Sequence, residues 1–344
     1  MTPDTSTDSR RAALEAWLRQ VLGAAPGRIA PASADASFRR YFRVWHGGRS
    51  TIAMDAPPPR EDIRPYIRVA AILAEAGANV PRVLAQDPLQ GFLLLTDLGE
   101  RPYLDAIRAG GDEQRLYADA IDTLVRIQAR GRVELLPPYD ETRLRREMEL
   151  FPQWFVSRHL GLEITPAERA MIDECFGLLA AEALRQPAVL VHRDYHSRNL
   201  MVCDDGNPGV LDFQDAVVGA VTYDPVSLLK DCYVRWPRQR MLGWLDLYRR
   251  RAIEAGVEID ADRRRFVRAF DLMGLQRHIK VLGIFSRLWY RDGKAGYLRD
   301  LPRVLEYALE AAAGEPALAA FDRFLRGRVR PAFGEAQARA LAAA

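Results

Sequence analysis

The sequence is poor in lysine. Of its 49 basic residues only Lys230, Lys280 and Lys294 are lysines, so residues 1–229 contain none. Any phosphate or carboxylate contact made there by a basic side chain must come from arginine. The net charge of +3 is too small to indicate a nucleic-acid partner.

Cysteine and long apolar segments are also scarce. The three cysteines, Cys175, Cys203 and Cys232, are odd in number and lack metal-ligand spacing, which favours free thiols in a reducing compartment. No apolar run reaches the roughly 18 residues of a transmembrane helix. The polar N-terminus, MTPDTSTDSRR, has no apolar core like that of a signal peptide. We therefore expect a cytoplasmic protein without a membrane partner.

Composition fits an ordinary globular protein, with 49% hydrophobic and 28% charged residues. A chain of 344 residues is long enough for one large two-lobed domain or two ordinary domains.

The most informative stretch is residues 188–215, AVLVHRDYHSRNLMVCDDGNPGVLDFQD. Two short apolar runs flank the turn signal DDGNPG, which predicts a β-hairpin over 200–212. If the hairpin is centred near Gly206, Leu200 faces Asp212, which places Asn199 and Asp212 at the same end of the ribbon. Asp194 precedes Asn199 by one loop, so three oxygen-bearing side chains are expected to converge.

This spacing has a chemical interpretation. H-x-D-x-x-x-x-N followed by a strand-borne Asp is the arrangement that kinases use. Asn199 and Asp212 supply the hard oxygen ligands that Mg²⁺ prefers, and Asp194 is left to accept a proton from the acceptor hydroxyl. The alternative is a polar loop whose aspartates cap turns, and the second Asp in register disfavours it.

The element order predicts a bilobal α+β protein. Its first lobe is expected to be a small antiparallel sheet with one packed helix, in the order β-β-α-β-β. Helical patterns follow the apolar-to-polar change at Thr96, Asp97 and Leu98. We interpret this change as the connection between lobes and a contact for the adenine edge; the alternative is an ordinary strand end. We expect a nucleotide-binding lobe over 1–98 and a catalytic, substrate-binding lobe over 99–344. The predicted segments are a helix at 9–22, a hairpin at 36–44 and 51–54, a helix at 62–76, strands at 80–84 and 91–95, and helices at 112–130, at 140–160, from Thr165 and from Tyr223.

VHRDYHSRNLMV and VLDFQDAVVGAVTYDP resemble the aminoglycoside-phosphotransferase-like kinases, a family with the protein-kinase-like fold that includes choline and homoserine kinase-like enzymes. The resemblance implies ATP and Mg²⁺, with Asp194 as catalytic base and Asn199 and Asp212 as metal ligands. It also implies that His192 and the buried Asp224 support the catalytic loop.

A narrower resemblance is to the cell-wall-recycling kinases that phosphorylate the anomeric hydroxyl of N-acetylmuramate and N-acetylglucosamine. It is carried by SFRRYFRV, MDAPP, DFQDAVVG and QRHIKVLGIFSRLWYRDGKAGYL. It implies a small-molecule sugar substrate and a role in peptidoglycan recycling.

Two departures from the general kinase pattern concern the phosphates of ATP. Residues 28–46 contain no glycine, so the phosphate-covering loop is expected to approach through Ala34, Ala36 and Ser37. The usual strand lysine is replaced by Met54. We therefore expect Arg40 or Arg43 to hold the phosphates, because a guanidinium binds them bidentately; the alternative is that both face solvent.

The acceptor side is predicted to be basic. Residues 231–300 carry 16 Arg and Lys against 9 Asp and Glu, which suits an anionic or neutral acceptor better than a polycation. Arg277 or Lys280 could pair with the lactyl carboxylate of N-acetylmuramate, while Tyr233 and Trp236 could stack on a sugar. The alternative is that these residues lie on a solvated helix surface.

Other functions stay open. They are a kinase of the same fold for another small alcohol, a protein kinase, and a nucleotide-binding pseudokinase. The missing strand lysine favours the pseudokinase, and the intact Asp194, Asn199 and Asp212 oppose it. The protein kinase is disfavoured because no glycine-rich loop and no A-P-E segment are present.

Overall fold

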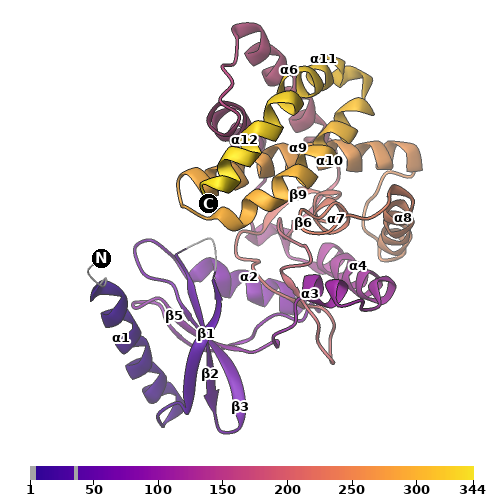
Figure 1. Ribbon diagram of the computed structural model, residues 1–344. Coiled ribbons are helices and arrows are strands. Elements are labelled where there is room, and N and C mark those ends of the chain that lie inside the picture. The colour runs from indigo at the N-terminus through magenta and orange to yellow at the C-terminus, as the bar shows by residue number, and fades with distance from the viewer. Residues whose placement is uncertain (1–4, 35–37) are drawn as a thin grey trace. The chain divides into compact units, whose positions relative to one another are not determined.

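The chain divides into two compact units in the computed structural model, which describes residues 5–34 and 38–344 (Figure 1). The first unit contains Met1–Arg101 and Met201–Asp215, and the second contains Pro102–Leu200 and Ala216–Ala344. The expected functional boundary between residues 98 and 99 stays a prediction.

The first unit is built on a five-stranded antiparallel sheet with the strand order β1-β2-β3-β5-β4. Strand β1 was not predicted, because RIAPASA contains a proline and no clear alternation; the expected β-β-α-β-β order is therefore wrong by one strand. The strands are β1 (Arg28–Ala34), β2 (Arg40–His46), β3 (Arg49–Asp55), β4 (Val83–Asp87) and β5 (Phe92–Thr96).

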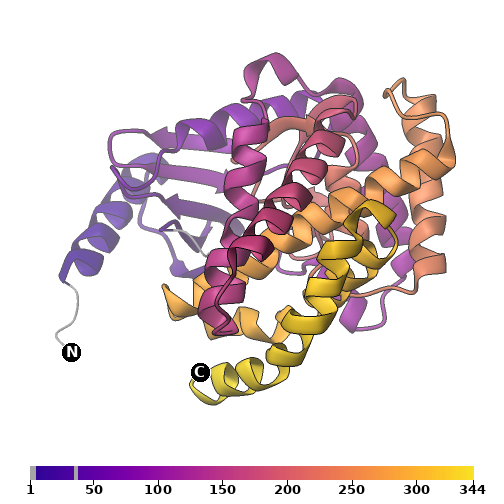
Figure 2. The same ribbon diagram turned by 90° about the horizontal axis from the view of Figure 1, so that it is seen from above.

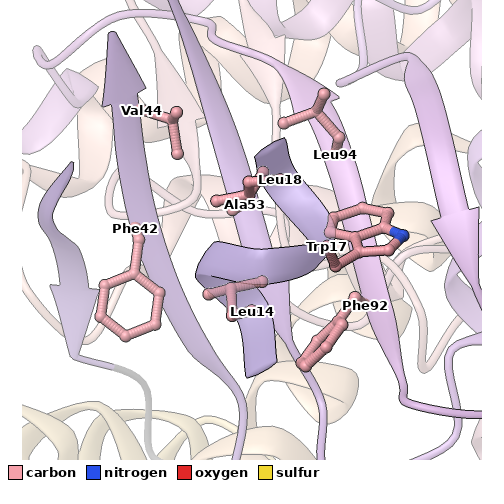
Figure 3. Packing of buried hydrophobic residues seen from close by; sticks show 8 residues of the cluster. All are labelled: Leu14, Trp17, Leu18, Phe42, Val44, Ala53, Phe92 and Leu94. Carbon is pink, nitrogen blue, oxygen red and sulfur yellow. The ribbon is translucent and has the colours of Figure 1, made fainter. Parts of the chain in front are cut away.

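Helix α1 (Thr5–Leu22) packs on one face of this sheet. Figure 3 shows its three apolar side chains against residues from β2, β3 and β5. Side chains of a strand alternate between faces, so the neighbouring residues of β3 and β5 lie on the opposite face, and these are buried too. The packed set is Leu14, Trp17, Leu18, Phe42, Val44, Ala53, Phe92 and Leu94.

Helix α2 (Arg64–Glu75) connects β3 to β4, as the pattern over 62–76 predicts. Its buried residues, Tyr66, Val69, Ala70, Ile72 and Leu73, recur at helical spacing along one face.

The second unit is mainly helical, which confirms the α+β fold class. Its longest helix, α9 (Arg263–Tyr290), contacts α6 (Pro166–Leu184), α7 (Tyr223–Leu229) and α10 (Leu301–Ala313), and Figure 2 shows the helical part of the chain, magenta to yellow, from a second direction. The helices are α3 (Tyr103–Arg108), α4 (Glu113–Arg130), η1 (Val133–Leu135), α5 (Glu141–Met148), η2 (Phe151–His159), α6 (Pro166–Leu184), α7 (Tyr223–Leu229), α8 (Arg238–Glu254), α9 (Arg263–Tyr290), η3 (Ala295–Asp300), α10 (Leu301–Ala313), η4 (Pro316–Leu318), α11 (Ala319–Phe324), η5 (Leu325–Val329) and α12 (Arg330–Ala342).

Two helix predictions have clear outcomes. Thr165 and Glu168 form the expected capping box at the start of α6. The segment 140–160 is not one helix, because α5 is followed by the π-helix η2, whose first residues are Phe151 and Pro152. Proline cannot donate a backbone hydrogen bond, so the regular α-helical ladder is not continued through this position.

Short strands frame the stretch 188–215. Strand β6 (Ala188–Val191) pairs antiparallel with β9 (Val217–Ala220), and β7 (Leu200–Met201) pairs with β8 (Gly209–Val210). The predicted hairpin is therefore present but shorter than expected, and Asp212 lies two residues beyond β8 rather than on a strand. Among the described residues, no helix is both long and apolar enough to cross a membrane.

Candidate active site

The loop that follows β6 is held from beneath by one buried carboxylate. Asp224 is fully buried and accepts hydrogen bonds from the backbone N–H groups of His192 (2.7 Å) and Arg193 (3.0 Å). Arg193 has a left-handed backbone with φ of 78°, which is uncommon for a residue with a side chain and needs such support. Burial raises the pKa of Asp224 to about 7, although both N–H donors and Arg277 favour its charged form.

Further contacts fix the rest of this loop. The Tyr195 hydroxyl donates to the carbonyl of Ala120 at 2.8 Å. The backbone N–H of Ser197 and its hydroxyl both donate to the buried Asp231, at 3.0 and 2.5 Å. Because these partners come from α4 and from the segment after α7, the loop conformation depends on the packing of the second unit.

Asp194 and Asn199 are joined within this loop. The side-chain amide nitrogen of Asn199 donates to the backbone carbonyl of Asp194 at 3.0 Å, which fixes the orientation of the Asn199 amide group. The Asp194 side chain is 40% exposed, so it can reach a small molecule. The two residues are therefore brought together as the sequence predicts.

Cations surround the Asp194 carboxylate. One guanidinium nitrogen of Arg277 lies 3.5 Å from Asp194 Oδ1, and the other donates to the Arg193 carbonyl at 2.8 Å. Burial disfavours ionisation of Asp194, but Arg277, Lys280 and Arg193 outweigh it and hold the pKa of this carboxyl well below its usual range.

A second carboxylate, which the sequence did not indicate, neutralises part of this positive charge. Glu147 in α5 pairs with Arg193 and with Lys280, whose ammonium lies 2.9 Å away, and accepts a hydrogen bond from the Tyr139 hydroxyl. Burial raises the pKa of Glu147, but these two cations dominate and lower it. Its two cationic partners are 46 and 133 residues away in sequence, so no local pattern could identify this cluster of charges.

Asp212 belongs to the first unit. It has a left-handed backbone with φ of 60°, and its Oδ1 accepts a hydrogen bond from the Gln214 amide at 2.8 Å. The Arg39 guanidinium lies 3.6 Å from the same oxygen. The next residue, Phe213, is anchored against Tyr66 with ring centroids 4.8 Å apart. Backbone strain at a residue held in place by its neighbours is typical of functional positions.

The oxygen donors fit magnesium chemically. An Asn amide and an Asp carboxylate are hard ligands, and Mg²⁺ usually adds water and phosphate oxygens to one or two carboxylates. Residues 5–34 and 38–344 contain no group of three or more His, Cys, Asp or Glu side chains that could hold a metal ion. The assignment of Asn199 and Asp212 as ligands stays a prediction.

The two arginines expected to hold phosphate both have carboxylate partners in the first unit. Arg40 bonds the buried Asp55, with Nε 3.0 Å from Oδ2, and Arg43 bonds Asp97, with Nε 2.6 Å from Oδ2. Neither is simply solvent-facing. Arg39, the residue before Arg40, was not identified from the sequence. In the structure its side chain is 11% exposed and lies beside Asp212.

The remaining residues expected at the nucleotide are placed as follows. Met54 is fully buried in β3 opposite Leu93. The Thr96 hydroxyl accepts the Arg82 backbone N–H at 2.9 Å at the end of β5. Leu98 follows Asp97, and its carbonyl accepts a hydrogen bond from the Cys203 thiol. Ser37 and Ala36 lie outside the described residues.

Arg277 and Lys280 do not lie on a solvated helix surface. Their side chains are 3% and 5% exposed on α9, and the Lys280 ammonium also donates to the Tyr223 hydroxyl at 3.1 Å. The alternative of a solvated surface is therefore wrong for these two residues, because α9 is covered on several sides.

The two aromatic residues expected at the sugar occupy different surroundings. Tyr233 lies under the Arg198 guanidinium, 4.2 Å from its ring centroid, and Tyr297 is the second aromatic ring near that guanidinium. Trp236 instead donates to the Tyr117 hydroxyl at 2.7 Å. Arg198 and Tyr297 were not identified from the sequence, although Arg198 precedes Asn199 directly.

Residues 28–266 match the family model described as the phosphotransferase enzyme family. The chain is 48% identical to an N-acetylmuramate/N-acetylglucosamine kinase of Pseudomonas aeruginosa, over 93% of this chain and 97% of that one. It is 50% identical to a protein of the same name from Pseudomonas putida, over 91% and 94% of the two chains.

Solved structures share the fold at low sequence identity. The ADP-bound aminoglycoside phosphotransferase APH(2'')-Ib superposes with a TM-score of 0.59 and 15% identity, covering 87% of this chain and 98% of that one. The choline kinase LicA from Streptococcus pneumoniae gives a TM-score of 0.59 and 10% identity, covering 87% and 99%.

Proposed function

Because the chain belongs to the phosphotransferase enzyme family, we propose that it transfers the γ-phosphoryl group of ATP to the anomeric hydroxyl of N-acetylmuramate or N-acetylglucosamine. The observation that carries this proposal is the identity of 48–50% with kinases named for these two sugars, over more than nine-tenths of the chain. A cytoplasmic role in peptidoglycan recycling follows from that substrate and from the need for ATP.

Asp194 is proposed to orient the acceptor hydroxyl and accept its proton. With a pKa well below its usual range the carboxylate is always charged at neutral pH, but it is a weak base. Phosphoryl transfer has a loose transition state in which the acceptor loses its proton late, so orientation matters more than basicity. An anomeric hydroxyl is more acidic than other sugar hydroxyls, which suits a weak base.

Asn199 and Asp212 are proposed to hold Mg²⁺, which when bound neutralises charge on the phosphates. Arg39 is the best-supported substitute for the missing strand lysine, because its guanidinium lies 3.6 Å from the carboxylate of Asp212, the proposed metal ligand. We propose that Arg39 contacts a phosphate of ATP.

Arg277 is proposed to act on both sides of Asp194. Its bond to the Arg193 carbonyl supports the loop, and its position 3.5 Å from the Asp194 carboxylate places a buried positive charge where a phosphoryl group would be transferred. Arg198 with Tyr233 and Tyr297 is proposed as a wall for the sugar, since an aromatic face and a guanidinium fit a ring that carries hydroxyl and carboxylate groups.

The test is an acceptor panel. ATP consumption is measured with N-acetylmuramate, N-acetylglucosamine, an aminoglycoside, choline and homoserine, and the product is examined for loss of the reducing end. Only the two amino sugars are expected to be turned over, with the phosphate at the anomeric carbon. Preferred turnover of an aminoglycoside, choline or homoserine would contradict the substrate. MgATP binding without any turnover would favour the pseudokinase.

A further inference from the structure

A large cavity lies within the second unit, and its lining residues come from the segments 230–241, 263–272 and 307–316. Its volume is about 1090 Å³, and none of its lining residues belongs to the loop 192–199. Arg277 and Lys280 are not among them either. The cavity is therefore lined separately from the Asp194 site.

The lining is strongly basic. Seven cationic side chains and three carboxylates belong to the lining, and three of the cations pair with carboxylates just outside it, Asp246, Asp260 and Glu182. The cations are Lys230, Arg235, Arg238, Arg263, Arg264, Arg265 and Arg268, and the carboxylates are Asp271, Glu310 and Glu315.

One carboxylate serves two of these cations. Arg238 makes a bidentate pair with Asp271 at 2.7 and 2.6 Å, and the buried Lys230 ammonium lies 2.7 Å from the same carboxylate. Arg264 is exposed and forms no ion pair with any residue that the structure describes. Positive charge on this side of the cavity is thus incompletely neutralised.

Several of the other pairs are weak. The Arg235 pair with Glu310 has side chains 40% and 56% exposed, and the pairs of Arg263 and Arg265 with carboxylates outside the lining are exposed as well. Ion pairs in such surroundings contribute little to stability, because water screens the charges and the side chains lose conformational freedom. The pairs of Arg263 with Asp246 and of Arg265 with Asp260 are bidentate. Phosphate oxygens fit the same fork geometry, so a phosphate ligand could replace these exposed carboxylates.

An aromatic wall contains an unpaired polar group. Tyr307 is 4% exposed, and its hydroxyl has no hydrogen-bond partner within the described part of the chain. The Arg235 guanidinium lies over its ring, 5.3 Å from the centroid. A buried unpaired hydroxyl is unfavourable, and such groups in native structures often mark a place where a ligand or water completes the bonding.

We propose that this cavity is a second binding site, for a small molecule that carries a diphosphate group. A diphosphate supplies three to four negative charges, enough to take the place of the exposed carboxylates that pair with Arg235, Arg263 and Arg265. A single phosphate would replace fewer of them. The cavity volume slightly exceeds that of typical small-molecule sites, which is about 300–1,000 Å³, so a further group attached to the diphosphate has room to pack against the aromatic wall.

The test titrates inorganic pyrophosphate into the intact chain in an EDTA-containing buffer. Isothermal titration calorimetry measures the binding. The variants are Arg235→Gln, Arg264→Glu and the double variant. Arg250→Glu is the charge-matched control, because Arg250 is exposed on α8 and does not line the cavity. Acceptor-dependent ATP turnover of each variant shows that the fold is intact.

One binding event is expected. Each lining variant should weaken it by about tenfold, since a charge-assisted bond is lost, and the control should not. Binding should persist when ADP saturates the nucleotide site. No binding, equal weakening by the control, or displacement by ADP would each overturn the proposal, and none of these outcomes bears on the acceptor panel.

Discussion

Asp194 combines two features that usually oppose each other, since it is reachable by a small molecule and yet surrounded by buried cations. The side chain is 40% exposed, whereas that of Arg277 is 3% exposed. Ion pairs with buried cations are screened little by salt, so they act on the protonation of Asp194 under all ordinary conditions.

The first prediction concerns the pH dependence of turnover. Asp194 must be ionised to accept a proton, and its pKa lies below the usual range of an Asp, so kcat/KM for the sugar should show no loss from this group on lowering the pH to about 5. Replacing Arg277 by Gln removes the nearest cation and should raise the pKa of Asp194, so that kcat/KM begins to fall at a higher pH than in the wild type. Initial rates over a pH series at saturating MgATP give kcat/KM for the wild type and for the variant.

Arg250→Gln serves as the control for that series, because it removes an equal charge from an exposed position of α8. If kcat/KM of Arg277→Gln falls at the same acidic pH as that of the wild type, the guanidinium does not set the pKa of Asp194. Asp194→Asn should lower kcat by about 10²- to 10⁴-fold at every pH.

The second prediction concerns Glu147. Replacing it by Gln leaves Arg193 and Lys280 without their shared counter-charge in a buried position, which should lower the free energy of unfolding by about 3 kcal/mol. Tyr139→Phe removes one hydrogen bond to the same carboxylate and should cost only about 1 kcal/mol. Urea unfolding followed by circular dichroism measures the two losses.

Equal losses in the two variants would mean that Glu147 acts through its hydrogen bonds and not through its charge.

At the scale of elements, helix α9 and the π-helix η2 approach each other at backbone distance. A Cβ added at Gly283 of α9 would lie 2.3 Å from the backbone carbon of Leu150, the residue before η2. Such an approach is possible only for glycine, because backbone atoms cannot give way as a flexible side chain can. The position of η2, and of the preceding α5 with Glu147, therefore depends on this glycine.

The third prediction follows from this contact. Gly283→Ala should lower the free energy of unfolding by about 3 kcal/mol, since the two elements must separate. Gly243→Ala in α8 is the matched control: nothing lies within 4 Å of its added Cβ, so it should raise stability by about 0.5–1 kcal/mol through helix propensity. Thermal and urea unfolding of both variants give the sign of the change in the free energy of unfolding. An unchanged stability of Gly283→Ala would exclude the close packing of α9 on η2.

At the scale of the whole molecule, the chain crosses between the two compact units after residues 101, 200 and 215. Asp212 is in one unit, and Asp194 and Asn199 are in the other. A ligand that needs all three residues gains its affinity only when the units act together, so binding and global stability should be linked.

The fourth prediction tests that link. A non-hydrolysable ATP analogue with Mg²⁺, at about 100 times its dissociation constant, should stabilise the protein by about 2.7 kcal/mol and raise Tm accordingly. Asp212→Asn, which keeps a residue type that tolerates the left-handed backbone of this position, should lose most of the magnesium-dependent part of this shift while its Tm without ligand stays near the wild-type value. Differential scanning calorimetry with Mg²⁺ or EDTA separates the two parts, and an unchanged magnesium-dependent shift would remove Asp212 from the metal site.

Local pattern was sufficient for features whose cause is local. The capping box at Thr165, the helices at 62–76 and 112–130, and the pairing of the two runs around Gly206 depend on residues close in the chain, and the sequence predicts them. The strand β1 was missed because its residues form a strand through pairing with β2 rather than through their own alternation.

The bilobal α+β fold class and the motif containing Asp194, Asn199 and Asp212 follow from the sequence alone, because motif spacing is a local property, whereas the first strand of the sheet was missed. The ion pairs are known only from the folded chain: Glu147 with Arg193 and Lys280, Arg39 with Asp212, and Arg277 with Asp194. Electrostatic interactions act between groups close in space whatever their separation along the chain, so no pattern within one segment can reveal such pairs.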